Sequence, residues 1–278
     1  MTTIELTGRC PLLSSAQLPT TWNPDLFDLS KLEWITPFEV ASIAAVWSRL
    51  VATGSVPAVR LPHDAMVRSY LVDIGLSEVI PGRWGDGGGY SGEPPWLPLT
   101  RLESGNDWDD IVQDLWPDVA GLFADPDLTR NTMDLLGELI DNAVTHGHSN
   151  AGTYVCAQRY TGATSNLPQG IWIGVADSGV GIPRHLRRNP KYADIEDDRQ
   201  LIRLARQPWV TGTRDRRGWG LVEVFESATE AGPARIVMRS GHAQGEFRLQ
   251  SGIRVSARYR SLSPSVPGTW IHVRLEPA

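Results

Sequence analysis

Residues 135–146 read LLGELIDNAVTH, and this stretch decides the fold. Its apolar residues recur at helical spacing, which predicts the packed face of an amphipathic helix. Glu138, Asn142 and His146 are spaced i, i+4 and i+8, so they would share one stripe of that helix. An amide oxygen can ligate Mg2+, and a carboxylate can take a proton from water or a hydroxyl. The stripe is therefore compatible with a metal–phosphate site, although taken alone it favours an amphipathic helix whose polar residues face solvent.

The sequence on either side of this helix predicts further helices and strands. A helix is expected over 107–123, and the cap of the central helix is expected at Thr129 or Asn131. Six strands are expected after it, at 153–160, 170–176, 234–239, 245–249, 252–260 and 269–275. Two more helices are expected at 198–206 and 221–231. Helices followed by hairpin-like strands indicate a layer of helices on a mixed sheet.

A second motif begins where the strand 170–176 ends. Asp177 follows the strand directly, and Gly179 and Gly181 come two and four residues later. A carboxylate at a strand end can accept a hydrogen bond from an exocyclic amine, and glycines let the backbone approach a flat ligand. The alternative interpretation is an Asp-Ser-Gly turn between two elements.

A third motif precedes the helix expected over 221–231. Gly218 and Gly220 stand immediately before Leu221, so they would open that helix. The N–H groups at the start of a helix can bind phosphates, and Arg214 adds positive charge nearby. A basic surface loop would have the same composition. Thr269 follows Gly268 at the start of the last strand, where its hydroxyl could support an adenine-binding Asp through water.

Taken in order, the four motifs resemble the ATP-binding domain of the GHKL family, named for gyrase, Hsp90, histidine kinases and MutL. Glu138-x-x-Asp141-Asn142 is similar to its N box, Asp177-x-Gly179-x-Gly181 to its G1 box, and Gly218-x-Gly220-Leu221 to its G2 box. Gly268-Thr269 resembles the late G3 segment. The resemblance covers residues 107–278 and implies an α/β fold, a two-layer sandwich of helices on a mixed sheet. It also implies a lid over about 183–217.

The resemblance carries roles to individual residues. It implies that Glu138 is the general base and that Asn142 ligates Mg2+. It implies that Asp177 binds the adenine amine of ATP, with Gly179 and Gly181 shaping the pocket. The resemblance also places five further residues in the nucleotide site, namely Arg214, Gly218, Gly220, Leu221 and Thr269.

Within that family, two patterns remain open. Glu138, Asn142, Ala143 and His146 match the anti-sigma-factor serine kinases, whereas Asp141 beside Asn142 also matches gyrase and MutL. A histidine kinase that phosphorylates itself is disfavoured, because no pair of helices carrying an acceptor histidine is visible.

The first 82 residues resemble STAS domains, the antagonists of anti-sigma factors. This likeness rests on four expected elements: a strand at 26–29, a helix from Phe38 to about Thr53, a strand at 56–61 and a helix at 63–74. Where STAS domains have Asp-Ser before the helix, this chain has Thr36-Pro37, and proline cannot be phosphorylated. Thr36 therefore reads better as a helix cap than as an acceptor.

Composition limits the other possibilities. The chain of 278 residues has only 2 cysteines, which excludes a disulfide scaffold and a four-cysteine zinc site. Lysine occurs only at Lys31 and Lys191, so no Walker A motif exists. The net charge of −6 predicts no nucleic-acid partner. No signal peptide and no spanning segment are visible, so we expect a cytoplasmic protein without membrane contact.

Glycine and proline are dense between residues 83 and 105, which predicts a linker between a STAS-like domain (1–82) and the ATP-binding domain (106–278). The expected function is a Mg-ATP-binding regulatory protein, an ATPase or a serine/threonine protein kinase, with a protein partner or substrate. A non-catalytic, nucleotide-gated interaction switch is the alternative. A sheet-based interaction domain without nucleotide would require all four motifs to coincide by chance.

Overall fold

The computed structural model describes residues 2–13, 22–85, 97–103, 111, 116–117, 119–121, 125–147, 151–162, 168–212, 233–250 and 253–276. The fold is of the α/β class. Its largest sheet has five strands in the order β6-β7-β8-β10-β9. Their bounds are Leu97–Leu102 (β6), Thr153–Tyr160 (β7), Gly170–Asp177 (β8), Ala234–Gln250 (β9) and Ile253–Leu275 (β10).

The five-stranded sheet differs from the mixed sheet that we expected. Between its described strands every pairing is antiparallel. β7 and β8, like β9 and β10, are neighbours both in the chain and in the sheet, and short connections join such strands in antiparallel fashion. The four strands expected between 234 and 275 are two long ones, because β10 bulges between Ser261 and Thr269 without ending.

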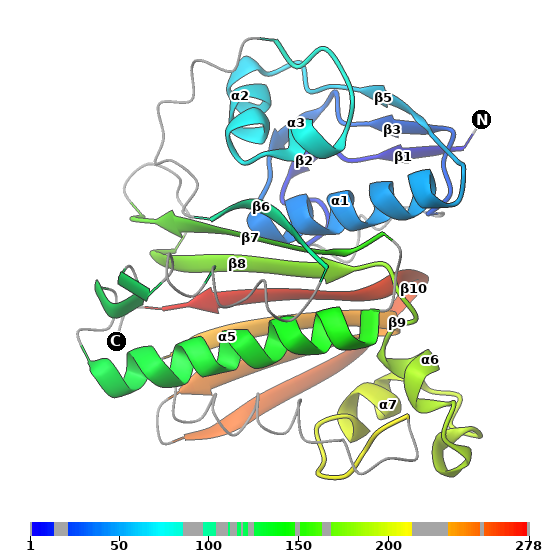
Figure 1. Ribbon diagram of the computed structural model, residues 1–278, viewed down its shortest axis with the longest axis vertical. Coiled ribbons are helices and arrows are strands. Elements are labelled where there is room, and N and C mark those ends of the chain that lie inside the picture. Colours follow the sequence, from blue (N-terminus) through cyan, green and yellow to red (C-terminus); the bar gives the residue numbers. More distant parts are fainter. Residues whose placement is uncertain are drawn as a thin grey trace.

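Helices cover both faces of this sheet (Figure 1). Helix α5 (Pro126–Gly147) lies on one face, and helix α1 (Pro37–Ala52) lies on the other. Side chains alternate accordingly along β7, where Val155 packs with α5 and Cys156 packs with α1. Two-sided burial explains why β8 is an almost uninterrupted apolar run that is buried at every position.

Residues 2–85, which we call the N-terminal module, contain the predicted parallel unit. β1 (Thr3–Glu5), β3 (Leu26–Asp28) and β5 (Ala58–Arg60) form a parallel sheet, and α1 connects β3 to β5. A pair formed by β2 (Gly8–Arg9) and β4 (Leu32–Trp34) and the helices α2 (Ala65–Asp73) and α3 (Leu76–Val79) complete the module. The strand–helix–strand–helix prediction is confirmed. β1, β2 and β4 were not predicted.

The N-terminal module and the large sheet share one hydrophobic core. Buried side chains of the sheet join the core of the module, among them Tyr154, Cys156, Ala176, Leu262, Val266 and Trp270. The segment that we expected to be a linker without regular structure contains β6, so this part of the expectation is wrong. Residues 97–102 form a strand because their backbone groups pair with β7. Their sequence alone does not predict a strand.

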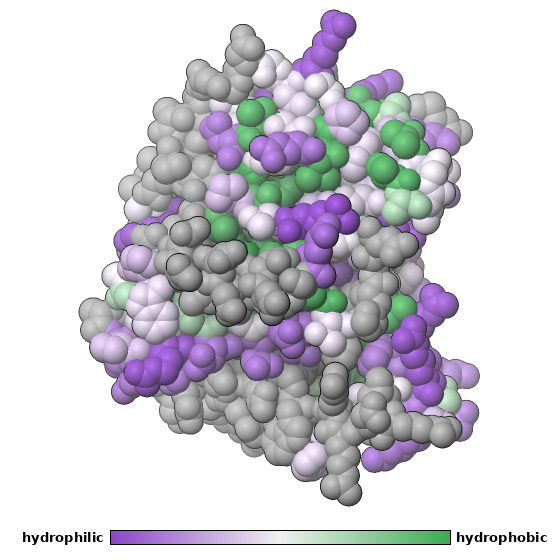
Figure 2. Space-filling view, viewed as in Figure 1, coloured by the Kyte–Doolittle hydropathy of each residue, from purple (hydrophilic) through white to green (hydrophobic). Residues whose placement is uncertain are grey.

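The face seen in Figure 2 is most hydrophobic over the N-terminal module. Three of the module's large apolar side chains are exposed, namely Val51, Val56 and Met66. None of the helices that the structure describes is both long enough and apolar enough to cross a membrane.

Helix α5 begins one turn earlier than predicted. The Oδ1 atom of Asp125 accepts hydrogen bonds from the N–H groups of Asp127 and Leu128, at 2.9 and 3.4 Å. Asp125 is therefore the cap, in place of Thr129 or Asn131, and Pro126 takes the first helical position, where its missing N–H costs nothing.

After β8 the chain forms a small helical unit. It contains α6 (Ile182–Leu186), the 3-10 helix η2 (Pro190–Tyr192) and α7 (Asp198–Leu204), which matches the helix expected at 198–206. These elements enclose a core of their own, made of Leu186, Tyr192, Leu201 and Ala205. The helix expected at 221–231 lies outside the described residues, as does most of the one expected at 107–123.

Candidate functional site

Asp177 is the last residue of β8 and is only 2% exposed. Its Oδ1 accepts a hydrogen bond from the Gly179 N–H at 2.7 Å, and its Oδ2 accepts one from the Thr269 N–H at 3.2 Å. Burial raises the pKa of this carboxyl to about 7, against the opposing effect of the two hydrogen bonds. The site thus contains a rigidly held carboxyl whose charge depends on small changes in its surroundings.

Two glycines allow the backbone segments around Asp177 to touch. Gly181 has a φ of +72° and Gly268 a φ of +69°. A Cβ at Gly181 would lie 2.8 Å from the Gly268 carbonyl oxygen, and one at Gly268 would lie 2.2 Å from the Asp177 carbonyl oxygen. Any larger residue would push the segments apart, so the contact requires glycine at both positions.

Thr269 lies beside Asp177, but its main-chain N–H makes the direct contact. Its hydroxyl is 3.1 Å from the hydroxyl of Ser240 on β9. The two residues are register partners in the pairing of β10 with β9. Thr269 thus contacts Asp177 through its backbone N–H, and the water-mediated role of its hydroxyl stays a prediction.

The carboxyl-terminal part of α5 lies at the same end of the sheet as Asp177 (Figure 1). Thr153 links the two, because it is the register partner of Asp177 and its hydroxyl donates to the Ala143 carbonyl oxygen at 3.2 Å. Asn142, next to Ala143, is partly buried, and its Nδ2 donates to the Glu138 carbonyl oxygen at 2.7 Å. This bond engages the amide nitrogen and not the oxygen that would bind a cation.

The other predicted site residues divide into two groups. Glu138 is partly buried on α5, one turn before Asn142. His146 belongs to the last turn of α5, and its side chain lies outside the described residues. Four more fall outside the described residues altogether: Arg214, Gly218, Gly220 and Leu221. The same holds for the end of the expected lid, of which residues 183–212 are described.

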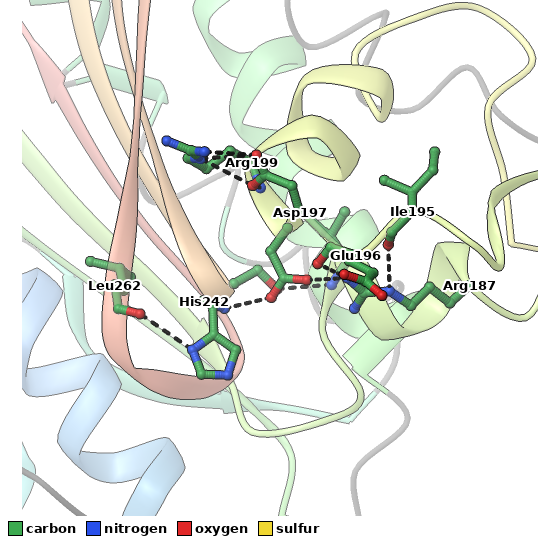
Figure 3. Close-up of polar contacts among 10 residues, drawn as sticks. Arg187, Ile195, Glu196, Asp197, Arg199, His242 and Leu262 are labelled. Atoms are coloured by element: carbon green, nitrogen blue, oxygen red, sulfur yellow. Dashed lines mark hydrogen bonds and ion pairs between the residues drawn. The ribbon is translucent and has the colours of Figure 1, made fainter.

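Charged and polar contacts connect the helical unit after β8, which is part of the expected lid, to the sheet (Figure 3). Arg187 forms an ion pair of 2.6 Å with Asp198, which begins α7 and is buried. The other carboxylate oxygen of Asp198 accepts from the His242 N–H at 2.6 Å. The His242 ring nitrogen Nδ1 lies 3.3 Å from the carbonyl oxygen of Leu262, in the β10 bulge.

Thr36, the residue that stands where STAS domains carry their acceptor segment, is completely buried. Its hydroxyl donates to the carboxyl of buried Glu39, and its N–H bonds to the same Oε2 atom at 2.8 Å. This arrangement is a helix cap sealed against solvent. The hydroxyl of Thr36 is therefore not accessible for phosphorylation in this fold.

Ser240 belongs to the site but was not predicted from the sequence. It is fully buried, its Oγ accepts from the Ile182 N–H at 2.8 Å, and its Oγ donates to the Gly268 carbonyl oxygen at 2.8 Å. No local pattern marks it, since its position follows from the register of β9 against β10.

No group of three or more His, Cys, Asp and Glu that could hold a metal ion occurs among the described residues. Comparison of the sequence with protein-family models and with curated proteins finds no match. The functional assignment therefore rests on the geometry of this site and on the motifs that led to it.

Proposed function

We propose that this protein binds Mg-ATP at Asp177 and is a regulatory ATPase or serine/threonine protein kinase related to the GHKL type. The observation that carries the proposal is the buried Asp177 carboxyl, held between the Gly179 and Thr269 N–H groups at the end of β8. An exocyclic amine of a flat base would give this carboxylate a hydrogen-bond donor. The backbone contacts at Gly181 and Gly268 shape the neighbouring surface without side chains.

The surroundings of Asp177 fit an adenine better than a cation. A carboxyl whose pKa is raised to about 7 by burial is poorly compensated when ionised. One hydrogen-bond donor is enough to stabilise the ionised carboxylate. A metal ion at the same place would require several further ligands. Adenine presents such a donor in its amino group.

Asn142 is the residue that would hold Mg2+. Its amide oxygen is a hard ligand of the kind that Mg2+ prefers. Asn142 precedes Ala143, whose carbonyl oxygen accepts from Thr153, the register partner of Asp177. One protein ligand is sufficient where phosphate oxygens and water supply the others. When bound, Mg2+ would neutralise phosphate charge.

Glu138 is the proposed general base. It precedes Asn142 by one helical turn, so both belong to the same stripe of α5. Glu138 would take the proton from a water molecule or a protein hydroxyl, whose oxygen bonds to the γ-phosphorus as the bond to the β-phosphate oxygen breaks. Hydrolysis and protein phosphorylation differ only in which hydroxyl reaches that position.

Calorimetric titration with Mg-ATP, combined with a phosphate-release assay, tests the proposal. Wild type should bind and release phosphate, Asp177→Asn should lose binding, and Glu138→Ala should bind but lose turnover. Asp134→Asn, an exposed carboxylate on the same helix, is the matched control and should behave as wild type. Unchanged binding in Asp177→Asn would contradict the adenine site.

A nucleotide-gated interaction switch without catalysis is the second candidate. The contact of the β10 bulge with the N-terminal module favours it, because the Trp22 Nε1–H donates to the Ser265 carbonyl oxygen at 2.7 Å. The same bulge leads directly to Gly268 and Thr269, so a ligand at Asp177 could change what the module exposes. Mg-ATP binding without turnover, in the presence or absence of protein substrates, would favour this candidate.

A further inference from the structure

Ser240 connects three separate segments through one side chain. It lies on β9 opposite Thr269 and is completely buried. Its Oγ accepts from the Ile182 N–H, donates to the Gly268 carbonyl oxygen, both at 2.8 Å, and lies 3.1 Å from the Thr269 hydroxyl. The segment after Asp177, the segment before Thr269 and strand β9 therefore meet at this atom.

These contacts require a group that donates and accepts at the same position. A hydroxyl has one donor and two acceptor lone pairs, which match the Gly268 carbonyl and the Ile182 N–H. Ile182 begins α6, so its N–H has no partner within that helix. Removing the hydroxyl would leave a buried donor and a buried acceptor unsatisfied.

We propose that Ser240 is a positioning residue of the nucleotide site, which holds Gly181 and Gly268 together and so keeps the Thr269 N–H on Asp177. The inference rests on the proposed function, since it assigns Ser240 a part in nucleotide binding. The geometry favours this role because a Cβ added at Gly181 would lie 2.8 Å from both the Gly268 carbonyl oxygen and the Ser240 Oγ, so these three groups are in close contact. Ser240 contacts Gly268 and Thr269 directly, and it acts on Asp177 through them.

Ser240→Ala tests the proposal, with Ser42→Ala as the matched control. Ser42 is equally buried, and its hydroxyl donates to the Phe38 carbonyl oxygen at 2.7 Å on α1. Both variants lose a buried hydroxyl, so both should unfold at lower urea concentration than wild type. Only Ser240→Ala should weaken Mg-ATP binding, with a dissociation constant about tenfold higher, which corresponds to the loss of one buried hydrogen bond.

Two further readouts separate positioning from stability alone. Hydrogen exchange at the Ile182 and Thr269 amides should accelerate in Ser240→Ala and not in Ser42→Ala. Turnover at saturating Mg-ATP should change less than the dissociation constant, because Glu138 remains in place. Ser240→Thr retains the hydroxyl and should restore part of the affinity.

The outcomes distinguish the inference from the function on which it rests. Suppose that wild type binds Mg-ATP and Asp177→Asn does not. If Ser240→Ala then binds as tightly as wild type, the role of Ser240 is overturned and the nucleotide site still stands. Wild type that does not bind would overturn both. If Ser240→Ala does not fold, Ser240→Cys takes its place, since a thiol is a weak donor and acceptor, and the same loss of affinity is expected.

Discussion

At the scale of single residues, Asp177 determines how the site should respond to pH. Its pKa of about 7 in the folded protein is well above the ordinary value of 3.8. Between these two pH values the folded chain keeps a proton that the unfolded chain has released. The contribution of Asp177 to stability is therefore lost as the pH rises from about 4 through 7.

Base binding should have the opposite pH dependence. The amine donor needs the ionised carboxylate, so below pH 7 binding must release a proton from Asp177. We expect the affinity for adenosine to increase about fivefold from pH 6 to pH 7 and to level off above about pH 8. Calorimetry in two buffers of different ionisation enthalpy measures the released proton, and adenosine is the probe because it has no titrating phosphate. Affinity that is constant between pH 6 and 8 would contradict this prediction.

At the scale of elements, α1 packs on β8 through a position where only glycine fits. A Cβ at Gly174 would lie 2.2 Å from the Pro37 carbonyl oxygen and 2.6 Å from the Phe38 nitrogen. The Cys156 Sγ, on the neighbouring strand and in register with Gly174, donates to the same Pro37 oxygen at 3.2 Å. The amino-terminal end of α1 thus rests directly on the backbone of the sheet.

Gly174→Ala should therefore separate α1 from β8. We expect a loss of about 2 to 3 kcal/mol in the free energy of unfolding, because the obstructing atoms belong to the backbone and cannot rotate away. Urea unfolding at constant pH provides the measurement. Gly121→Ala is the control, since a Cβ there meets nothing within 4 Å and alanine suits its helical position, so it should not lower the free energy of unfolding. Equal stability of the two variants would show that α1 is not in close contact with β8.

At the scale of the whole molecule, buried polar groups join the N-terminal module to the sheet. Arg239 on β9 is completely buried, its Nη2 donates to the Leu13 carbonyl oxygen at 2.9 Å, and its Nη1 donates to that of Leu12. Its Nε donates to Gln244 at 2.6 Å, and the guanidinium lies 5.4 Å from the centre of the Phe38 ring. A buried cation is costly to leave without such partners, so the contacts that Leu12 and Leu13 make with Arg239 tie the module to the sheet.

We accordingly expect the chain to unfold as one unit. Differential scanning calorimetry should give a single transition whose calorimetric and van't Hoff enthalpies agree. Arg239→Ala should lower the transition temperature by several degrees, because it leaves the Gln244 side-chain oxygen and two carbonyl groups without their buried donor. Two resolved transitions would instead indicate that residues 1–82 and 106–278 unfold independently.

Local patterns in the sequence were sufficient for several elements. The apolar spacing of 135–146 predicts α5, the run that ends at Asp177 predicts β8, and the segments around Thr36-Pro37 and Gly54 predict α1 between two parallel strands. These features depend on periodicity, on helix caps and on glycine conformations, which are properties of neighbouring residues. The turn at Asp177 with its two glycines is likewise visible in the sequence.

Only the tertiary structure decided which segments meet. Three contacts join residues that are far apart in the chain. They are the pairing that makes β6 a strand, the burial of both faces of the sheet by α5 and α1, and the placement of Ser240 against Gly268. No periodicity encodes these contacts, because strand order and register follow from packing over the whole molecule. The sequence by itself determined α5, β8, α1 and the position of Asp177 at a strand end, whereas the folded chain determined the surroundings that raise the pKa of Asp177.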